Sequence, residues 1–398
     1  MFWKKRRIYA DAAAATPLSR RARREFLRLL SVYGNAGALH AEGQRAHEEL
    51  EAARTRAAKA IGAHADEIIF TASGTEGNTL ALHGLLRPVL RERGTAHAMT
   101  LAIEHQSVLE PLRALVREGL ALTEAGVDAQ GLVMENAIVS AVRPDTALVS
   151  VQLVNSEIGA IEPVHQIAKG LRRAKHKIFL HTDASQAPLW VPVNVEKLGV
   201  DLMTLDAQKL QGPKGVGCLY VRRGTPIEPV LWGGKQERGL RGGTQNVPAI
   251  GSFALALEDA QRWQERRARK TAAVRDYLWS EILRLVPGAL LNGPHIGDVR
   301  LNAPPGEMRA ANNLNVSVPG LEAQMAVIAL DALGVGASTR SACTIGSQDP
   351  SHVIVALGVP TELSGTAIRI TLLPEATRAD ARRIAAALSE TARRYKKA

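Results

Sequence analysis

Two residues whose side chains can act as nucleophiles stand in glycine-rich surroundings, namely Lys209 and Cys343. Lys209 follows the apolar run DLMTLD (201–206) by three residues and precedes the turn GPKGVG, in which Lys214 is expected to face solvent. A lysine that is desolvated at such a place becomes nucleophilic and can form a Schiff base. Cys343 lies in the stretch GVGASTRSACTIGSQDPS (334–351), whose composition predicts a mobile loop. Together the lysine and the thiol indicate pyridoxal phosphate chemistry that ends on sulfur.

Two further segments could hold such a cofactor. The run KIFLHT (177–182) is followed by Asp183, and an acid at a strand end could keep a pyridinium nitrogen protonated. Taken alone, an aspartate there more often caps the next turn, so both interpretations stay open. The run EIIFT (67–71) leads into ASGTEGNTLALHGLL, where Ser73 and Thr75 stand beside the N–H groups of a helix start. Such a start binds phosphate, although Ser and Thr before a helix are more often plain N-caps.

The order of the apolar runs predicts an α/β fold. With 398 residues, 46% apolar and 4% aromatic, the chain is long enough for two domains packed mainly by aliphatic side chains. Between about residues 60 and 222, short β-rich runs alternate with helical patterns, which indicates βαβ units and a mostly parallel sheet. The runs are EIIFT (67–71), AMTLAI (98–103), ALVSVQLV (147–154), KIFLHT (177–182), DLMTLD (201–206) and CLYVRR (218–223), with helical segments at 106–118 and 164–175. Ligands of such sheets bind at the carboxyl ends of the strands.

Beyond about residue 250 the pattern changes to that of a smaller α+β domain. It predicts one long helix over 251–286, strands near 312–318 and 367–372, and helices near 321–333 and 376–395. The stretch that contains Cys343 belongs to this part of the chain.

Composition argues against several other classes of protein. Two cysteines without CxxC spacing form neither a disulfide framework nor a zinc site, which fits a reducing cytoplasm. The start of the chain is interrupted by Asp11, Thr16 and Pro17 before it could act as a signal peptide, and no run reaches the roughly 20 apolar residues of a membrane span. The net charge of +11 lies in clusters without interleaved aromatic residues, so we expect solvated helix faces and no direct binding of nucleic acid. No GxGxxG or GxxxxGK[ST] motif supports a nucleotide-binding oxidoreductase.

Ordered motifs along nearly the whole chain resemble those of the cysteine desulfurases, the NifS/IscS-like branch of the class V aminotransferase family. They are YADAAAATP (9–17), GNAGALHAEG (34–43), EIIFTASGTEGNTLAL (67–82), EHQSVLE (104–110), NSEIGAIEPV (155–164), HTDASQ (181–186), QKLQGPKGVGCLYVRR (208–223), QERGLRGGT (236–244), RSACT (340–344) and TAIRITL (366–372). This resemblance implies fold type I of the pyridoxal-phosphate-dependent transferases, an α/β fold whose large domain has a mostly parallel seven-stranded sheet. It implies a large cofactor-binding domain at 17–255 and a small α+β domain, with the cysteine loop, at 1–16 and 256–398.

The resemblance also implies roles around pyridoxal 5′-phosphate. Lys209 would carry the cofactor and move the Cα proton of the substrate, and Asp183 would pair with the pyridine nitrogen. His105 would stack on the ring, and Gln186 would contact the phenolic oxygen. Gly74, Thr75 and Gln208 would bind the phosphate, and Thr244 would reach the phosphate of a neighbouring subunit. Ser156 and Asp206 would lie beside the cofactor. Arg369 would bind the substrate carboxylate as a bidentate fork, and Asn35 is a further substrate-binding candidate.

The implied reaction converts L-cysteine to L-alanine. Cys343 would take the sulfur as a persulfide, and since only the thiolate attacks, nearby positive charge such as Arg340 should lower its pKa. Cys218 lies inside an apolar run and is expected to be a buried structural thiol. The implied sulfur acceptors are an iron–sulfur scaffold protein or a tRNA-thiolation sulfurtransferase, with Cys343 as a candidate transient iron–sulfur ligand and no other metal site. If Thr244 serves the other subunit, the protein is a homodimer.

Several positions depart from the family pattern. The family usually has Ser-x-His before its lysine, where this chain has Asp206 and Gln208. Gln208 can still donate a hydrogen bond, but Asp206 brings a carboxylate to a phosphate dianion and should weaken binding unless it turns away or is protonated. Ser156 replaces a common second Asn, and LLPEAT follows Arg369 where the family usually has a Gly-Arg-containing segment. We therefore expect an active desulfurase with altered cofactor affinity.

Two alternatives stay open. Another lyase of the same fold, such as a selenocysteine lyase-like enzyme, would not need Cys343 for activity on cysteine. A non-catalytic docking platform for sulfur-transfer or tRNA-modifying partners would account for the altered phosphate site and for the positive charge.

Overall fold

The computed structural model describes residues 7–298, 308–339 and 350–395, which fold around a seven-stranded sheet. The strand order is β2-β8-β7-β6-β5-β3-β4, and of these strands β8 alone runs antiparallel to its neighbours. The bounds are β2 (Ile68–Thr71), β3 (Ala96–Leu101), β4 (Leu120–Ala125), β5 (Thr146–Ser150), β6 (Phe179–Asp183), β7 (Leu202–Asp206) and β8 (Gly217–Val221). The expected mostly parallel seven-stranded sheet is confirmed.

Six of these strands coincide with predicted runs, and the seventh, β4, was not predicted. β4 is an edge strand that pairs only with β3 among the described strands. Its residues are mostly half-buried, whereas β3 and β5 are buried throughout. A half-exposed edge strand does not need a continuous apolar run, so its sequence signal is weak.

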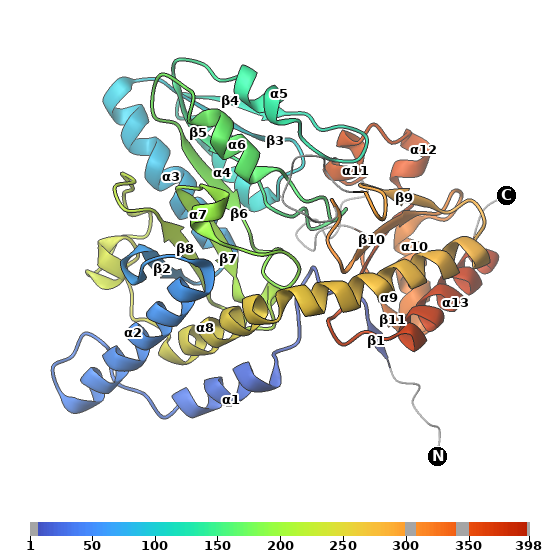
Figure 1. Cartoon of the computed structure of the whole chain (residues 1–398), viewed down its shortest axis with the longest axis horizontal. Helices are drawn as coiled ribbons and strands as arrows, with labels where there is room; N and C mark the ends of the chain where they lie inside the picture. Colours follow the sequence, from blue (N-terminus) through green and yellow to red (C-terminus); the bar gives the residue numbers. More distant parts are fainter. Residues whose placement is uncertain (1–6, 299–307, 340–349, 396–398) are drawn as a thin grey trace.

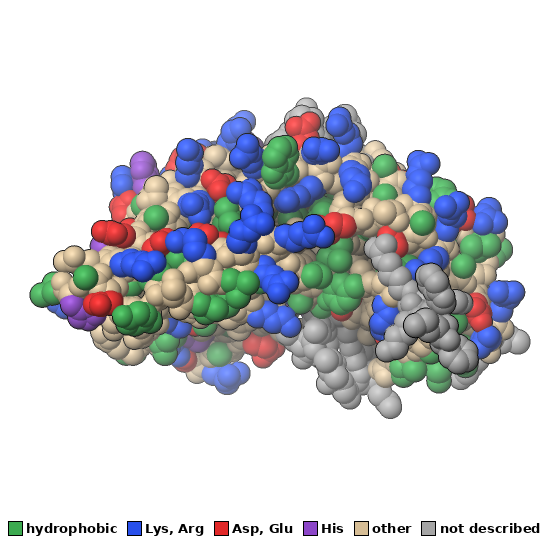
Figure 2. Space-filling model, turned by 90° about the horizontal axis from the view of Figure 1, so that it is seen from below, with side chains coloured by type: hydrophobic (Ala, Val, Ile, Leu, Met, Phe, Trp, Pro, Cys, Tyr) green, Lys and Arg blue, Asp and Glu red, His purple; other side chains and the backbone are tan. Residues whose placement is uncertain are grey.

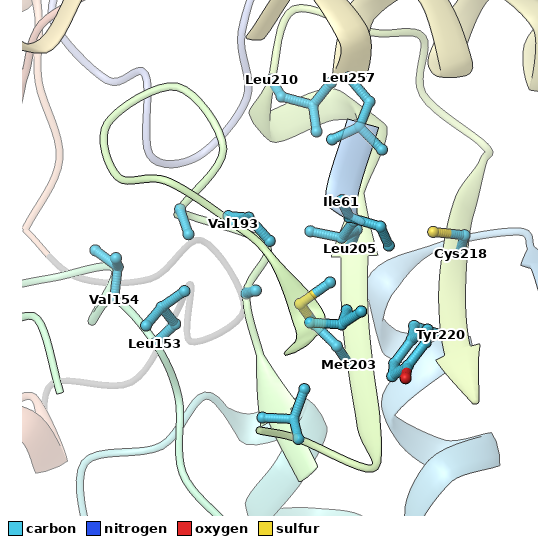
Figure 3. Close-up of a cluster of buried hydrophobic side chains, with 14 of the residues drawn as sticks. Ile61, Leu153, Val154, Val193, Met203, Leu205, Leu210, Cys218, Tyr220 and Leu257 are labelled. Carbon is cyan, nitrogen blue, oxygen red and sulfur yellow. The ribbon is translucent and has the colours of Figure 1, made fainter. Parts of the chain in front are cut away.

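Helices cover both faces of the sheet (Figure 1). One face packs against α3 (Gly74–Arg93) and α4 (Gln106–Val116), through side chains such as Leu82 and Leu112. The other face packs against α1 (Arg20–Leu29), α2 (Ala41–Ile61), α5 (Glu135–Ser140), α6 (Val164–Leu171), α7 (Val195–Leu198) and α8 (Val247–Arg262). Figure 3 shows part of this second core, where Met203, Leu205 and Cys218 lie among apolar side chains that include those of α2 and α8. Three 3₁₀ turns complete this part, namely η1 (Ala65–Glu67), η2 (Ala207–Lys209) and η3 (Gln236–Gly239).

A separate apolar cluster forms around a small antiparallel sheet with the order β12-β10-β9. Its elements are β9 (Leu290–Asn292), β10 (Asn313–Ser317), β12 (Ala367–Thr371), α9 (Gln264–Leu285), α10 (Ala323–Ala332) and α13 (Arg378–Tyr395), and α11 (His352–Ala356) and α12 (Thr361–Ser364) lie between α10 and β12 in the sequence. The start of the chain joins this cluster, because β1 (Ile8–Tyr9) pairs in parallel with β11 (Val335–Gly336). The domain limits given above stay a prediction.

The expectation of one long helix over 251–286 is wrong. The helix is interrupted at Trp263, whose backbone has left helical geometry, and α8 and α9 lie on either side of it. The Asp259 carbonyl accepts a hydrogen bond from the Trp263 N–H, at 3.3 Å, and from Nη1 of Arg267, at 2.9 Å. A side chain that inserts into the helical hydrogen-bond ladder in this way ends or kinks a helix. Residues 261–270 (QRWQERRARK) are mostly polar, as on an exposed helix face, so the pattern gives no distinct signal of the break.

The two basic clusters that lie wholly within the described residues are on exposed faces. Figure 2 shows Lys and Arg side chains gathered over the middle of the molecule seen from below. The clusters at 20–24 and 266–270 belong to α1 and α9 and are largely exposed. Arg21 of α1 pairs with Asp259 of α8. Among the described residues, no helix combines the length and the hydropathy that crossing a bilayer requires.

His181 makes the stability of the large sheet dependent on pH. Its ring is fully buried, with Nδ1 2.8 Å from Ser150 Oγ and Nε2 3.1 Å from Thr204 Oγ1, and burial lowers the pKa of His181 to about 4. The unfolded residue takes up its proton near pH 6.5. The contribution of the neutral His181 to the free energy of unfolding is therefore fully present above pH 6.5 and is lost as the pH falls towards 4.

Replacing His181 should weaken the pH dependence of stability. In urea titrations between pH 7 and 4.5, the slope of the unfolding free energy against pH measures how many more protons the unfolded state binds. We expect His181→Gln to reduce this number by up to about one. The exposed His47→Gln control should keep the full slope, and an unchanged slope in His181→Gln would contradict the assignment.

Candidate active site

The predicted site residues meet at the carboxyl ends of the parallel strands, as expected for this class of sheet. A cavity of about 250 Å³ lies there. Its lining includes most of the predicted residues: Gly74, Thr75, His105, Ser156, Asp183, Gln186, Asp206, Gln208, Lys209 and Arg369. Asn35 and Thr244 are exposed and do not line it. Cys343 and Arg340 lie outside the described residues.

Chemistry, and not size, identifies this cavity. A hollow of about 530 Å³ lies near the beginnings of β6 and β7, lined by residues such as Lys175, Ile178 and Asp201. In its lining, Asp201 is paired with Lys177 at 2.6 Å. None of the residues predicted to act on a cofactor lines it.

Lys209 is placed by β7 and by the start of the chain. β7 ends at Asp206, and the turn η2 carries Lys209 into the cavity. Its Nζ donates hydrogen bonds to the carbonyl oxygens of Ala13, at 2.9 Å, and Ala14, at 2.7 Å. Gln186 Nε2 also donates to the Ala13 carbonyl, at 2.9 Å. The backbone of residues 13–14 therefore orients the lysine amine, and Lys214 is exposed as predicted.

Asp183 caps a turn and also lines the cavity, so its role at a ring nitrogen stays a prediction. It is the last residue of β6, and Oδ1 accepts the Ser185 N–H at 2.9 Å, which is a turn cap. Oδ2 accepts from Asn78 Nδ2 at 2.8 Å, and the side chain also lines the cavity. One carboxylate therefore holds the turn and faces the place where a ring could bind.

His105, the N-cap of α4, lines the same cavity. Its Nδ1 accepts the Ser107 N–H at 3.1 Å and lies 2.8 Å from Ser107 Oγ. Burial lowers the pKa of His105, so the imidazole is neutral at neutral pH. A neutral, flat ring at the cavity wall can stack on an aromatic cofactor.

Two residues of this network, Asn78 and Ser107, were not predicted. Asn78 is fully buried on α3, and its Nδ2 donates both to Asp183 and, at 2.9 Å, to Ser107 Oγ. It thereby links the acid to the His105 contact. The sequence signal for Asn78 is a polar residue on the apolar face of a helix, one turn after Gly74.

The start of α3 forms a tight cup. A Cβ on Gly74 would lie 3.1 Å from Ser185 Oγ and 3.1 Å from Asp206 Cβ, which is closer than most Cβ contacts, so the position favours glycine. The Gly74 N–H donates to Asp206 Oδ2 at 3.2 Å. Gln208 donates to the same carboxylate from its backbone N–H and from Nε2, both at 3.1 Å. Asp206 thus does not turn away from the cup.

Arg369 brings a buried guanidinium to the cavity from β12. It is 1% exposed, and its Nη2 donates to Asp11 Oδ1 at 2.8 Å. Its Nε has no hydrogen-bond partner among the described residues. A buried, incompletely satisfied guanidinium is suited to bind a carboxylate. Asp11, which holds it, was not predicted as a site residue.

The segment with Thr244 is fixed from its own chain although Thr244 does not reach the cavity. Glu237 of η3 is buried in a positive-φ conformation, with φ of 45°. Arg54 of α2 donates two hydrogen bonds to its carboxylate, at 2.7 and 2.9 Å, and the Phe70 N–H donates a third, at 2.9 Å. Gln245, next to Thr244, also donates to Glu237, at 3.2 Å.

The described residues fit the ring end of pyridoxal phosphate. A carboxylate, a lysine amine and a neutral imidazole line one cavity at neighbouring strand ends. The phosphate end is less favourable, because a carboxylate occupies the helix start. This arrangement defines a pyridoxal-phosphate-dependent enzyme of fold type I.

Comparison with known proteins agrees with this class. Residues 8–384 match the aminotransferase class-V family, and the chain belongs to that family. It is 40% identical to cysteine desulfurase IscS of Dictyoglomus turgidum, over 92% of this chain and 90% of the relative, and 37% identical to cysteine desulfurase IscS of Methanosarcina thermophila, over 92% and 87%. A solved NifS-like protein superposes with a TM-score of 0.87 at 33% identity, covering 96% of this chain and 98% of that one. The structure of SspA in complex with cysteine has a TM-score of 0.76 at 29% identity, with 93% and 100% covered.

Loss of the Arg54 side chain should destabilise the protein and loosen the Thr244 segment. Arg54→Met leaves the Glu237 carboxylate buried without its charge partner, which costs about 3–5 kcal/mol of unfolding free energy. Denaturant titration measures this cost, and hydrogen exchange should show faster exchange of the 236–245 amides. Arg113→Ala, at a more exposed ion pair with Glu124, is the matched control and should cost less than about 1 kcal/mol. Equal costs in the two variants would contradict the structural role of the buried pair.

Proposed function

We propose that this chain is a cysteine desulfurase that uses pyridoxal 5′-phosphate to convert L-cysteine to L-alanine and transfers the sulfur to Cys343. The observation that carries the proposal is one cavity that contains the Lys209 amine, the Asp183 carboxylate and the Arg369 guanidinium. These groups match a cofactor aldehyde, a ring nitrogen and an amino acid carboxylate. Relatives named cysteine desulfurase, similar over most of their length, support the same activity.

The residues of the cavity divide the first half of the reaction among them. When bound, pyridoxal phosphate supplies an electron sink for negative charge that develops at the substrate Cα. Lys209 would hold the cofactor and move the proton at Cα, while Asp183 keeps the ring nitrogen protonated. Arg369 binds the substrate carboxylate and thereby orients Cα towards the lysine. His105, being neutral, covers the ring without adding positive charge.

Cys343 carries the second half of the reaction in this proposal. Its thiolate attacks the substrate sulfur, so that an S–S bond forms and the Cβ–S bond breaks. The electron pair of the broken bond stays with the carbon fragment, which takes up protons and leaves as alanine. Cys218 cannot serve this purpose, because it is fully buried and burial raises the pKa of its thiol to about 12.

The partners of the enzyme are part of the proposal. We propose a cytoplasmic homodimer in which Thr244 contacts the cofactor phosphate of the other subunit. The exposure of Thr244, and its place outside its own cavity, support this arrangement. The sulfur acceptor would be an iron–sulfur scaffold protein or a tRNA-thiolation sulfurtransferase.

Cys343→Ala should bind cofactor but not make alanine from L-cysteine. The expected result is a visible absorption band like that of the wild type, with alanine formation reduced at least 100-fold, because no thiolate accepts the sulfur. Absorption spectra and amino acid analysis after L-cysteine is added measure the two properties. Cys218→Ala is the matched control and should keep its activity, whereas Lys209→Ala should lack the band.

The same experiment separates the competing enzyme class. If Cys343→Ala formed alanine at the wild-type rate, the protein would be a lyase that does not need the thiol. If the wild type showed a Lys209-dependent band but left L-cysteine unchanged, the desulfurase proposal would fail.

Mixing two inactive variants tests the homodimer. Thr244→Asp places a carboxylate against the phosphate of the other subunit, and Lys209→Ala removes the catalytic amine of its own subunit. Randomly re-paired mixtures should regain about a quarter of wild-type activity, since half of the dimers are mixed and each has one intact site. Activity and sedimentation of the mixture measure this. No recovery in a mixture that sediments as a dimer would contradict the assignment of Thr244 to the other subunit.

A further inference from the structure

The anion-binding position at the start of α3 is occupied by a side chain of the protein itself. α3 has 20 residues, and the N–H groups at such a helix start attract anions. Here the Gly74 N–H donates to the Asp206 carboxylate, which is buried and lines the cavity. A Cβ on Gly74 would lie 3.1 Å from Asp206 Cβ and 3.3 Å from Asp206 Oδ2, so the glycine lets the carboxylate approach the helix start closely.

Neutral groups hold this carboxylate in place. It accepts hydrogen bonds from the Gly74 N–H, the Gln208 N–H and Gln208 Nε2. Gln208 thus directs its amide towards Asp206. Lys209 Nζ donates to the carbonyls of Ala13 and Ala14. Two of the donors available to a phosphate, Gly74 and Gln208, are therefore already engaged by an anion.

We infer that Asp206 sets the affinity and the exchange rate of the cofactor by competing with its phosphate for the start of α3. The inference rests on the proposed function, because it takes pyridoxal phosphate as the ligand. A phosphate dianion that enters the cup must displace the carboxylate from Gly74 and then remain close to it, and like charges at such a distance repel strongly. The ring contacts through Asp183, His105 and Lys209 do not involve this competition. The cofactor is consequently held by its ring end and is released and reloaded readily.

The test compares two ligands that differ only in the phosphate. Pyridoxal phosphate and 5-deoxypyridoxal have the same ring and aldehyde, but 5-deoxypyridoxal carries a methyl group in place of the phosphate ester. Equilibrium titrations followed by the Lys209-dependent visible band give a Kd for each ligand. The proteins are the wild type, Asp206→Asn, Asp206→Ser and the control Glu76→Gln, each checked for folding by circular dichroism.

Asp206→Asn should lower the Kd of pyridoxal phosphate at least tenfold and change that of 5-deoxypyridoxal less than twofold. Asp206→Ser should likewise lower the Kd of pyridoxal phosphate and leave that of 5-deoxypyridoxal within twofold, and the dissociation rate of pyridoxal phosphate should fall in both variants. Glu76 is a carboxylate in the same helical turn that accepts the Ala72 N–H and pairs with Arg241 outside the cavity lining. Its replacement by Gln should have a smaller effect, which separates the local contact from the overall charge.

Two results of the titrations would overturn this inference alone. One is a Kd of pyridoxal phosphate that is unchanged or higher in both Asp206 variants. The other is an equal effect on both ligands, which would mean that Asp206 shapes the whole cavity. If the Asp206 variants bound pyridoxal phosphate more tightly as expected, but the wild type formed no alanine from L-cysteine, the inference would stand and only the desulfurase proposal would be contradicted. The absence of a Lys209-dependent band in every protein would overturn both.

Discussion

The site depends on one constraint, that the parallel strands β6 and β7 lie side by side and end at the same edge of the sheet. Their pairing sets Asp183 opposite Thr204, two residues before the end of β7. The chain beyond β7 must therefore pass close to the acid, and the turn η2 brings Lys209 there. A change of register between these strands would move the acid and the lysine apart and would turn their side chains to the opposite faces.

Much of this arrangement could be predicted from the sequence. Lys209 and Asp183 follow buried apolar runs, and such runs are the strongest signal of interior strands. Contacts that form only in three dimensions could not be predicted. Asp11 reaches Arg369 across more than 350 residues of sequence, and Asn78 reaches Asp183 from a different element. At the break near Trp263, the Arg267 side chain donates to the Asp259 carbonyl, a contact that the sequence pattern does not reveal.

The orientation of the Asp206 carboxylate could not be predicted from the identity of the residue alone. The sequence places an acid near a phosphate site and predicts repulsion, but it does not say which way the carboxylate points. The structure has it accept from Gly74 and Gln208. The side chain thus satisfies a donor of the helix start and, by the same contact, opposes a phosphate that would bind there.

The N-terminal segment connects the two cores. Residues 8–9 add a strand beside β11, and the carbonyls of residues 13–14 hold the Lys209 amine. A fragment beginning at residue 17 would keep every strand of the large sheet and yet lose the acceptors that orient its lysine. The orientation of the lysine on the large sheet therefore depends on a segment that is anchored in the smaller apolar cluster.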